Sequence, residues 1–448
     1  RQAGGAFGDA RGAACGAGAC GGAGNPLAAP LLPGPRMRDH TLAIDFGTSN
    51  SAAAIVQDGR IRRLAIEPGA ETLPTAVFFP ARGGAMRIGQ AASDALIDGA
   101  EGRYMRALKS VLGTGLFHES RLIAGRRRTL AEIVAAFLAE LRKRAEAASG
   151  LTFRRALSGR PVHFHSNDPE RDAQAEADLR GCYLAAGFAE VAFLPEPEAA
   201  ALASHGMGRP GEIGLIVDIG GGTSDFSVFR STGTAVDILA SHGIRLGGTD
   251  FDRLVSLSRA MPALGHGGRL RREMGPGLLP VPNAVYVDLA TWAKIPFLYT
   301  PETRRMAADM ARMAEDRAAM DRLVTVLDEE LGHELAFAVE RGKIAANDGG
   351  NGRIAMGFIQ PGLAQPLDRQ ALDAALEDCR AELYQAAAQT LAMAGVAPGQ
   401  VGSVILVGGS SLMGLVAEEA LRLCPAAQLL RSEAFTAVVD GLALAAAR

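Results

Sequence analysis

Three consecutive glycines interrupt an apolar run in the stretch IVDIGGGTSDFSV, Ile216–Val228, and they limit what this chain can fold into. Glycine weakens a strand, since it has no side chain to pack and loses more conformational freedom on folding than other residues. A strand pattern keeps glycine where another backbone or a ligand approaches closely. The run therefore predicts two strands joined by a turn whose backbone lies against something else.

A second stretch, AIDFGTSNSAAAIV at Ala43–Val56, has the same plan. In both stretches an apolar strand ends in an aspartate, a glycine-containing turn with a threonine follows, and a second strand begins. Two similar hairpins in the two halves of the chain indicate an internal duplication.

The two hairpins suggest a shared chemistry. Glycine-rich turns expose backbone amides that favour phosphate, and Thr48, Ser49 and Thr223 add hydroxyl groups. Asp45 and Asp218 would repel a bare phosphate, so their presence favours a hard cation such as Mg²⁺ between carboxylate and phosphate. We expect facing hairpins that hold a nucleotide triphosphate, with a glycine bulge that serves packing alone as the alternative.

The length and the charge of the chain exclude several classes of protein. A chain of 448 residues is too long for one ordinary core, so two or more domains are expected. The net charge of −3 provides no general basic field for nucleic acid. Apolar and charged contents of 48% and 21% are typical of a soluble globular protein, and no apolar run reaches the roughly 18 residues of a membrane span.

The first 36 residues are mostly Gly, Ala and Pro and have no helical or strand period. Their scattered apolar residues do not resemble a signal peptide, and we expect a disordered tail, with Met37 as the true start. The five cysteines form no paired framework, which fits a reducing cytoplasm. We expect Cys182 and Cys424 to be plain core residues.

Blocks of strand and helix pattern predict an α/β protein with mixed sheets. The clearest signals are a hairpin turn at Asp58-Gly59, a helix that starts with the capping box of Thr129 and Glu132, and a helix that Asp168 caps. Other expected elements are a strand at RPVHF (160–164), helices over 301–347, a last buried strand at SVILVGGSS and a last helix at FTAVVDGLALAAA.

Motifs of other enzyme classes fail on inspection. No G-x-x-x-x-G-K-[ST] phosphate loop occurs, and GGSSLMG lacks the spacing of a hydrolase nucleophile elbow. His333 begins HEL but has no second histidine four residues on. His163 and His165 lie two apart, so we expect them on one face of a strand, where packing explains them better than metal binding.

Five blocks in order resemble the ATPase domain of the heat-shock protein 70 family, most closely its short YegD-like branch. They are IDFGTSNS, LPEPEAAALA, IVDIGGGTSDFSVF, IRLGGTDFD and VILVGGSS, and the resemblance runs from Met37 to Arg448. It implies the actin-like ATPase fold, two ribonuclease-H-like lobes around a nucleotide cleft. The implied boundaries are 37–208 for lobe I and 209–448 for lobe II, with a divergent helical subdomain at about 255–350.

The resemblance also implies roles for individual residues. Asp45 and Asp218 match the paired aspartates around Mg²⁺, and Glu196 matches an acid near the attacking water. The segment YMRALKSVLG makes Lys109 the candidate catalytic lysine, and Thr223 of the second phosphate hairpin is a further catalytic candidate. The implied nucleotide contacts are Thr48, Ser49 and Asn50; Gly220, Gly221 and Gly222; Gly247 and Gly248; Glu340 and Lys343; and Gly408, Gly409 and Ser410.

The expected function is an ATP-binding, slowly hydrolysing nucleotide switch of chaperone type, with ATP or ADP and Mg²⁺ as ligands and an unknown protein client. The chaperones carry a peptide-binding module after the ATPase, and we expect none here because the sequence stops at GLALAAAR. We expect a cytoplasmic monomer without membrane or nucleic-acid partners. The alternatives are a small-molecule kinase of the same fold, for which no acceptor-directed carboxylate is identifiable, and an actin-like assembly protein.

Overall fold

The computed structural model describes residues 40–203, 210–232, 236–350, 352–431 and 436–447. The tail predicted for residues 1–36 lies outside these ranges, and the described residues belong to one compact unit. Within the described ranges no helix combines the length and the apolar character that crossing a membrane requires.

The first half of the chain is built on a sheet with the order β11-β10-β1-β2-β3, and β4 also pairs with β2. β1 runs parallel to β10 and antiparallel to β2. Asp58 and Gly59 form the turn between β2 and β3 with φ of 52° and 74°, the conformation of the tight hairpin turn that the sequence predicts. The strands are β1 (His40–Phe46), β2 (Asn50–Gln57), β3 (Arg60–Arg63), β4 (Thr72–Pro74), β10 (Phe153–Arg160) and β11 (Glu190–Pro195).

Two long helices, α3 (Leu130–Ser149) and α4 (Pro169–Ala185), belong to this half, and both begin where the sequence predicts. Thr129 and Glu132 form the predicted capping box, with the Thr129 hydroxyl accepting from the Glu132 amide at 3.2 Å. Asp168 caps α4 by accepting from the Arg171 amide at 3.1 Å.

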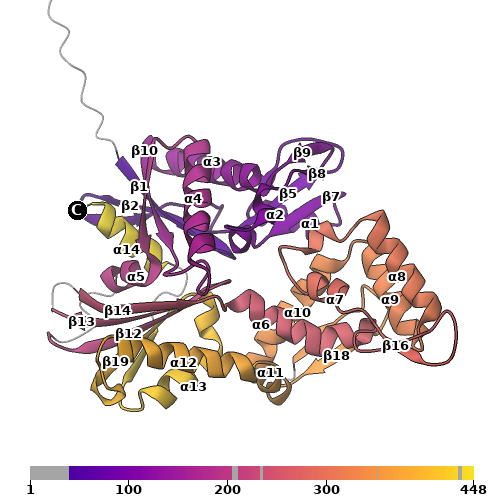
Figure 1. The fold of residues 1–448 in the computed structure, drawn as a ribbon. Helices are drawn as coiled ribbons and strands as arrows, with labels where there is room; N and C mark the ends of the chain where they lie inside the picture. The colour runs from indigo at the N-terminus through magenta and orange to yellow at the C-terminus, as the bar shows by residue number, and fades with distance from the viewer. Residues whose placement is uncertain (1–39, 204–209, 233–235, 351, 432–435, 448) are drawn as a thin grey trace, which may run out of the picture. The chain divides into compact units, whose positions relative to one another are not determined.

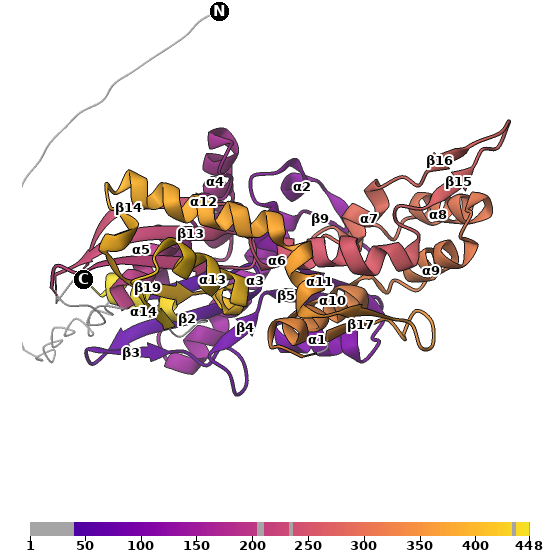
Figure 2. The same cartoon turned by 90° about the horizontal axis from the view of Figure 1, so that it is seen from below.

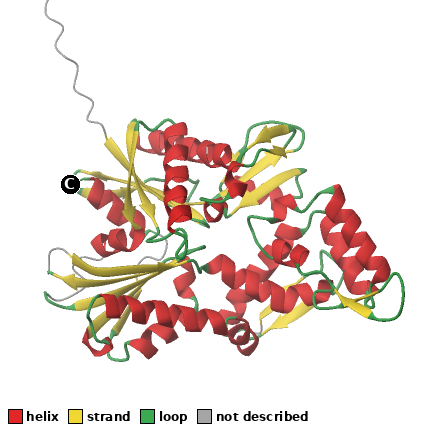
Figure 3. Cartoon of the chain, in the orientation of Figure 1, coloured by secondary structure: helices red, strands yellow, loops and turns green. Residues whose placement is uncertain are grey.

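The second half repeats the plan in a sheet with the order β14-β13-β12-β19-β20. β12 pairs antiparallel with its hairpin partner β13 and parallel with the later strand β19, as β1 pairs with β2 and β10. The duplicated hairpins expected from the sequence are therefore matched in topology, and Figure 3 shows the two sheets as separate groups of strands. The strands are β12 (Ile213–Ile219), β13 (Ser224–Ser231), β14 (Val236–Ile244), β19 (Val401–Val407) and β20 (Gln428–Arg431).

Helices α5 (Glu196–Ala203) and α14 (Ala437–Ala446) lie between the two sheets. Ala43 of β1 and Ile216 of β12 share one buried cluster with these helices. Because strand side chains alternate between faces, Asp45 and Asp218 project toward the same middle layer as Ala43 and Ile216. Figure 1 shows the yellow helix α14 beside indigo β1 and β2, although it comes from the end of the chain.

Outer helices cover the other faces. Phe137 of α3 packs on Phe46 of β1 with ring centroids 5.8 Å apart. Helix α12 lies along β13 and β14 (Figure 2). The remaining helices of the second sheet and its surroundings are α6 (Gly248–Val255), α11 (Arg369–Ala375), α12 (Glu377–Met393) and α13 (Gly414–Leu423).

Smaller elements extend each half on one side. In the first half these are β5 (Ala76–Pro80), β6 (Arg87–Ile88), α1 (Gln90–Ile97), β7 (Gly102–Arg106), a 3-10 helix (Leu108–Val111), α2 (Gly115–His118), β8 (Arg121–Ile123) and β9 (Arg126–Arg128). In the second half they are β15 (Arg269–Arg271), β16 (Leu278–Pro280), α7 (Ala284–Leu289), α8 (Pro301–Met313), α9 (Arg317–Asp328), α10 (Gly332–Asn347), β17 (Gly352–Ala355) and β18 (Ala364–Leu367).

The predicted strand at RPVHF is wrong. β10 ends at Arg160, and the following backbone finds other partners: the Arg160 guanidinium donates to the carbonyls of Pro161 and Val162, and the Val162 amide donates to Asp225 Oδ1 at 2.8 Å. His163 and His165 therefore lie in a loop and share no strand face. Cys182 and Cys424 are buried, as expected.

The predicted extents of the two lobes, 37–208 for lobe I and 209–448 for lobe II, remain a prediction.

Candidate functional site

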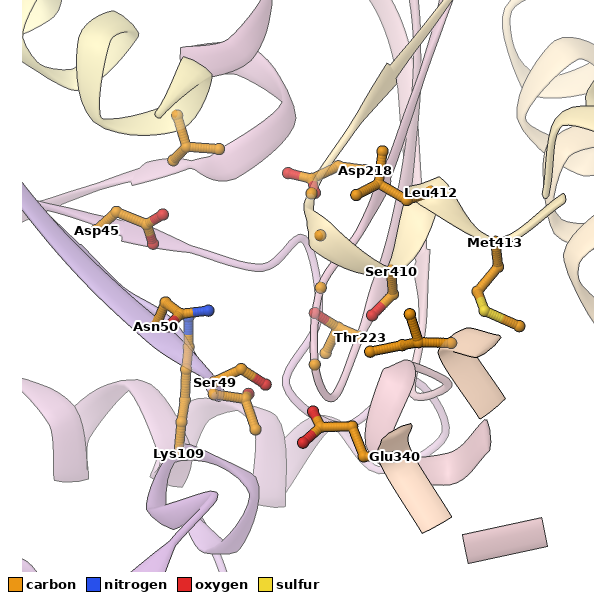
Figure 4. Close-up of a pocket in the computed structure, with 18 of the residues that line it drawn as sticks. Asp45, Ser49, Asn50, Lys109, Asp218, Thr223, Glu340, Ser410, Leu412 and Met413 are labelled. Atoms are coloured by element: carbon orange, nitrogen blue, oxygen red, sulfur yellow. The ribbon is translucent and has the colours of Figure 1, made fainter. Parts of the chain in front are cut away.

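A cavity of about 420 Å³ opens between the turns of the two duplicated hairpins. Figure 4 shows Asp45, Ser49, Asn50 and Lys109 on one side and Asp218, Thr223, Ser410, Leu412 and Met413 on the other. Of the sequence-predicted site residues, the following line it: Asp45, Thr48, Ser49, Asn50, Lys109, Glu196, Asp218, Gly220, Gly221, Thr223, Glu340, Lys343, Gly408, Gly409 and Ser410.

The two hairpin turns approach each other closely. A Cβ on Gly221 would lie 2.7 Å from Ser49 Oγ and 3.0 Å from Thr48 Cβ, so a side chain at this position would force the first hairpin turn to move. The first turn is tight as well, because the Gly47 amide donates to the Asn50 carbonyl at 3.1 Å. Part of what the glycines accommodate is therefore the opposite hairpin.

Gly222, Gly247 and Gly248 do not line the large cavity. The Gly248 amide donates to the Gly220 carbonyl at 3.0 Å, and a Cβ on Gly247 would lie 2.6 Å from the Gly222 nitrogen. Gly247 and Gly248 thus let the start of α6 pack against the back of the second turn, whereas Gly222 lies against Thr48 of the first turn. The structure places Gly247 and Gly248 in support of the turn.

Four carboxylates surround Lys109 at one end of the cavity. We call this end, which the largely buried side chains of Lys109 and Glu196 line, the closed end. Lys109 Nζ lies 2.7 Å from Glu196 Oε1, and both side chains are largely buried. Burial, with the Glu196 charge, raises the pKa of Asp45 to about 7, against the lowering effect of Lys109. Burial and the charge of Glu196 also raise the pKa of Asp218 well above the usual range. The fourth carboxylate, Asp225, has its pKa raised by the same two causes.

Asp225 belongs to the acidic cluster, although the sequence motif that contains it predicts no role for it. Strand register was the available signal, because Asp225 of β13 pairs directly with Asp218 of β12. Its carboxylate is buried and accepts from the Val162 amide. It adds negative charge to the cluster and fixes the loop that follows β10.

The acidic cluster fits a hard divalent cation. If all its carboxylates were ionised, they would hold more negative charge than Lys109 can balance, and the raised pKa values of Asp45 and Asp218 reflect that cost. A bound cation would favour their charged forms. The described residues contain no group of three or more His, Cys, Asp or Glu side chains arranged to hold a metal directly. Asp45 and Asp218 thus suit a cation that keeps most of its water ligands, as Mg²⁺ does.

Lys109 also responds to the cluster. Burial alone would lower the pKa of its ammonium group, but the Glu196 and Asp45 charges outweigh burial and raise it. Lys109 is therefore a fixed cation at the closed end of the cavity.

The opposite end of the cavity is built from paired side chains. Glu340 forms two contacts with the Arg106 guanidinium at 3.2 and 3.3 Å, and Lys343 Nζ lies 2.7 Å from Asp252 Oδ1. Trp292 donates to the other oxygen of Asp252 at 3.0 Å. Glu340 and Lys343 do line the cavity as predicted, but their charges are already engaged within the protein.

Several lining residues at this end escaped the sequence analysis. Ile344 and Leu412 are 50% and 42% exposed and offer apolar surface to the cavity. The side chain of Asn347 accepts from the Gly414 amide at 2.7 Å and so ties α10 to α13. Only their position in the sequence could have predicted them, because each lies one to four residues after a predicted nucleotide contact. These residues are Ile344, Asn347, Leu412 and Met413.

Comparison with known proteins agrees with the predicted resemblance. Residues 118–258 match the family model described as Hsp70 protein. The chain is 33% identical over 222 residues to the chaperone protein DnaK of Thermosipho melanesiensis, and the aligned region covers 49% of this chain and 35% of the relative. It is 32% identical over 241 residues to the chaperone protein DnaK of Thermotoga neapolitana, which covers 53% of this chain and 38% of the relative. The matched region thus spans little more than a third of the length of these curated relatives.

Proposed function

We propose that this chain, which carries an ATPase domain of the heat-shock protein 70 family with the actin-like fold, is a slowly hydrolysing ATP switch of chaperone type. One observation supports this above others. Two topologically equivalent hairpins face each other across a cavity whose closed end holds an engaged lysine among four carboxylates. The YegD-like branch, the protein client and a cytoplasmic location are parts of the same proposal.

The triphosphate would lie between the hairpin turns. Backbone amides of Thr48, Ser49 and Gly221, together with the hydroxyl of Thr223, are suited to phosphate oxygens. Mg²⁺, when bound near Asp45 and Asp218, supplies positive charge that offsets the repulsion between carboxylate and phosphate.

Hydrolysis would need little covalent work from the protein. A water oxygen bonds to the γ-phosphorus while the bond from that phosphorus to the β–γ bridging oxygen breaks; one of the water's protons stays on the phosphate product and the other passes to solvent. Glu196 would orient the water, and Lys109, which donates to Glu196, would stabilise charge on the moving phosphoryl group. ADP and inorganic phosphate are the products.

The adenosine would lie toward the other end. The Gly408–Ser410 turn lines the cavity beside Asp218, and Gly408 has a φ of 82°, at which a Cβ would lie 2.4 Å from the Ile219 carbonyl. Ile344 and Leu412 offer apolar surface for a base. Glu340 and Lys343 remain proposed ribose contacts, which would share their charges with Arg106 and Asp252.

Replacing Gly221 with Val tests the two-hairpin site. The branched side chain would meet Ser49 and Thr48, so titration calorimetry with Mg·ATP should detect no binding. Gly357→Val is the matched control, because Gly357 is exposed and nothing lies within 4 Å of its Cβ position. Normal ATP affinity in a folded Gly221→Val protein would refute the proposed site.

A further inference from the structure

Two apolar side chains are exposed at the end of the large cavity that is opposite the closed end. Ile344 of α10 and Leu412 of the 3-10 helix Gly409–Leu412 both line the cavity, and they are 50% and 42% exposed. Contact between apolar surface and water is unfavourable, so a ligand that covers these side chains gains affinity. We call Ile344 and Leu412 the apolar pair.

Asn347 holds the two elements of the apolar pair next to each other. Its side-chain oxygen accepts from the Gly414 amide at 2.7 Å, and its side-chain nitrogen donates to the Leu412 carbonyl at 3.3 Å. Ile344 precedes Asn347 by three residues on α10, so their side chains lie on the same face of that helix. The two members of the apolar pair therefore adjoin one joint, and each comes from a different element.

Two charged side chains at this end are bound to other groups of the protein. Both carboxylate oxygens of Glu340 accept from the Arg106 guanidinium. The ammonium group of Lys343 contacts Asp252, and both of these side chains are buried. A ligand that used either charge in full would have to displace a partner within the protein.

The side-chain amide of Asn347 is also engaged, and this decides what it can recognise. A side-chain amide identifies adenine by accepting from the N6 amino group and donating to N7. The Asn347 nitrogen carries two protons. It donates to Asp348 Oδ1 at 3.2 Å and to the Leu412 carbonyl at 3.3 Å. In this arrangement Asn347 therefore has no proton left for N7 of adenine.

Asp348 leaves the choice between purines open. It is exposed and lines the cavity, and its ionised carboxylate can only accept hydrogen bonds. Adenine carries an amino group at N6, and guanine carries one at N2. Asp348 is thus an acceptor that suits either base.

We propose that the cavity binds adenine and guanine nucleotides with similar affinity, and that the apolar pair provides most of the affinity for the base. The proposal rests on the nucleotide binding proposed above and widens its substrate class to purine nucleotides. A site that hydrogen-bonds its substrate rejects an analogue without the matching group by about 10⁴–10⁵-fold, whereas an apolar pocket discriminates by only about 10²-fold. Adenine and guanine share one bicyclic ring system, so their apolar contacts should be nearly equal.

Titration calorimetry with the Mg²⁺ complexes of ADP, GDP and CDP tests the proposal, because diphosphates leave no γ-phosphate to hydrolyse. The Kd values for ADP and GDP should agree within about tenfold. CDP should bind more weakly than both, since its single ring covers less apolar surface. A preference for ADP over GDP of a hundredfold or more would overturn the proposal. CDP binding as tight as ADP binding would overturn it too, because the base would then not touch the apolar pair.

Serine substitutions identify the residues that hold the base. Ile344→Ser and Leu412→Ser should each weaken ADP and GDP binding by about fivefold, and by the same factor for both nucleotides, because each removes apolar surface of about half a side chain. Leu184→Ser is the matched control, since Leu184 is 48% exposed on α4 and does not line the cavity. Unchanged affinity in both cavity variants, or a loss confined to ADP, would contradict the proposed role of the apolar pair.

An alanine substitution tests whether Asn347 reads the base. Asn347→Ala should leave the ratio of the ADP and GDP affinities unchanged, even if both affinities fall when α10 is released from Gly414. A ratio that shifts tenfold toward GDP would show that Asn347 recognises adenine, and would overturn the proposal.

The outcomes in wild type separate this proposal from the proposed function. Binding of ADP without GDP would refute similar affinity for the two purines and leave the ATP site intact. Absence of binding for all three nucleotides in the folded protein would refute the ATP site, and this proposal with it.

Discussion

The two ends of the cavity that we propose holds the nucleotide are built on different principles. At the closed end, where the phosphates are proposed to bind, short turns bring backbone amides and glycines together. Four carboxylates surround the single cation Lys109 at this phosphate end. At the other end, charged side chains from distant segments neutralise each other in pairs, as Arg106 does with Glu340. The difference teaches that the first end is prepared for a charged ligand, whereas the second is largely satisfied without one. Substitutions should therefore affect chemistry at the first end and stability at the second.

Lys109→Met should produce the largest effect and tests the phosphate end. In the proposed function its ammonium would act mainly on charge that develops during the reaction, so single-turnover hydrolysis should slow by about 10²–10³-fold, by analogy with loss of an oxyanion donor. ATP affinity, measured by calorimetry, should change far less because the hairpin amides remain. Lys143→Met, at an exposed lysine of α3, should hydrolyse ATP at the normal rate. Normal hydrolysis in Lys109→Met would remove this lysine from the site.

Asp218→Asn should follow with a loss of metal-dependent binding. The change removes one charge from the acidic cluster, so Mg·ATP affinity should fall by about 10–100-fold, as for loss of a group around a bound metal. ATP affinity in EDTA should fall less or rise, since a repulsive carboxylate is gone. An equal loss with and without Mg²⁺ would show that Asp218 does not act through a cation.

His333 links the second end to pH. It is buried at the start of α10, between the rings of Tyr104 and Trp292, and burial together with the Arg106 charge lowers its pKa to about 3. The unfolded chain takes up the proton near pH 6.5, whereas the folded chain does not. Stability is therefore complete above pH 6.5 and falls with pH by up to about 1.4 kcal/mol per unit until about pH 3.

Replacing His333 with Leu isolates this contribution. Urea unfolding at pH 7.5 and 5.0 should show a wild-type loss that exceeds the loss of the variant by about 2 kcal/mol. Identical losses in the two proteins would mean that His333 titrates normally in the folded state.

The Arg106–Glu340 pair should show the smallest effect and sharpens the second half of the comparison. Both side chains are mostly buried, and the guanidinium also stacks 4.6 Å from the Trp292 ring. A double-mutant cycle with Arg106→Met and Glu340→Gln should give a coupling of about 0.5–2 kcal/mol in unfolding free energy. The exposed pair Arg82 and Glu101, at 3.4 Å, is the matched control and should give a coupling near zero. A coupling near zero for both pairs would remove the stabilising role proposed for this end.

Most residues of the phosphate end could be predicted from the sequence, because they lie in short motifs that are recognisable without knowledge of the fold. The hairpins, the glycines and the caps of α3 and α4 are each encoded within a few residues. The sequence did not predict Arg106, Trp292 and Asp252 as part of the site. Their contacts join segments that are distant in the sequence, so they depend on how β7, α6 and α10 pack. The false strand at 160–164 has a related cause: the distant Asp225 and the Arg160 side chain take the backbone hydrogen bonds that a strand would have used.

Helix α14 imposes an order on the making of this protein. Gly441 lies so close to the backbone of α5 that a Cβ would sit 1.7 Å from the Ala199 carbonyl, and α14 packs on β1 and β2. A ribosome that adds about 5–20 residues per second needs roughly 20–80 s to pass from β2 to α14. During that interval the apolar inner face of the first sheet lacks α14, the helix that packs on β1 and β2. The nascent chain is therefore exposed to aggregation for longest where its earliest and latest segments must meet.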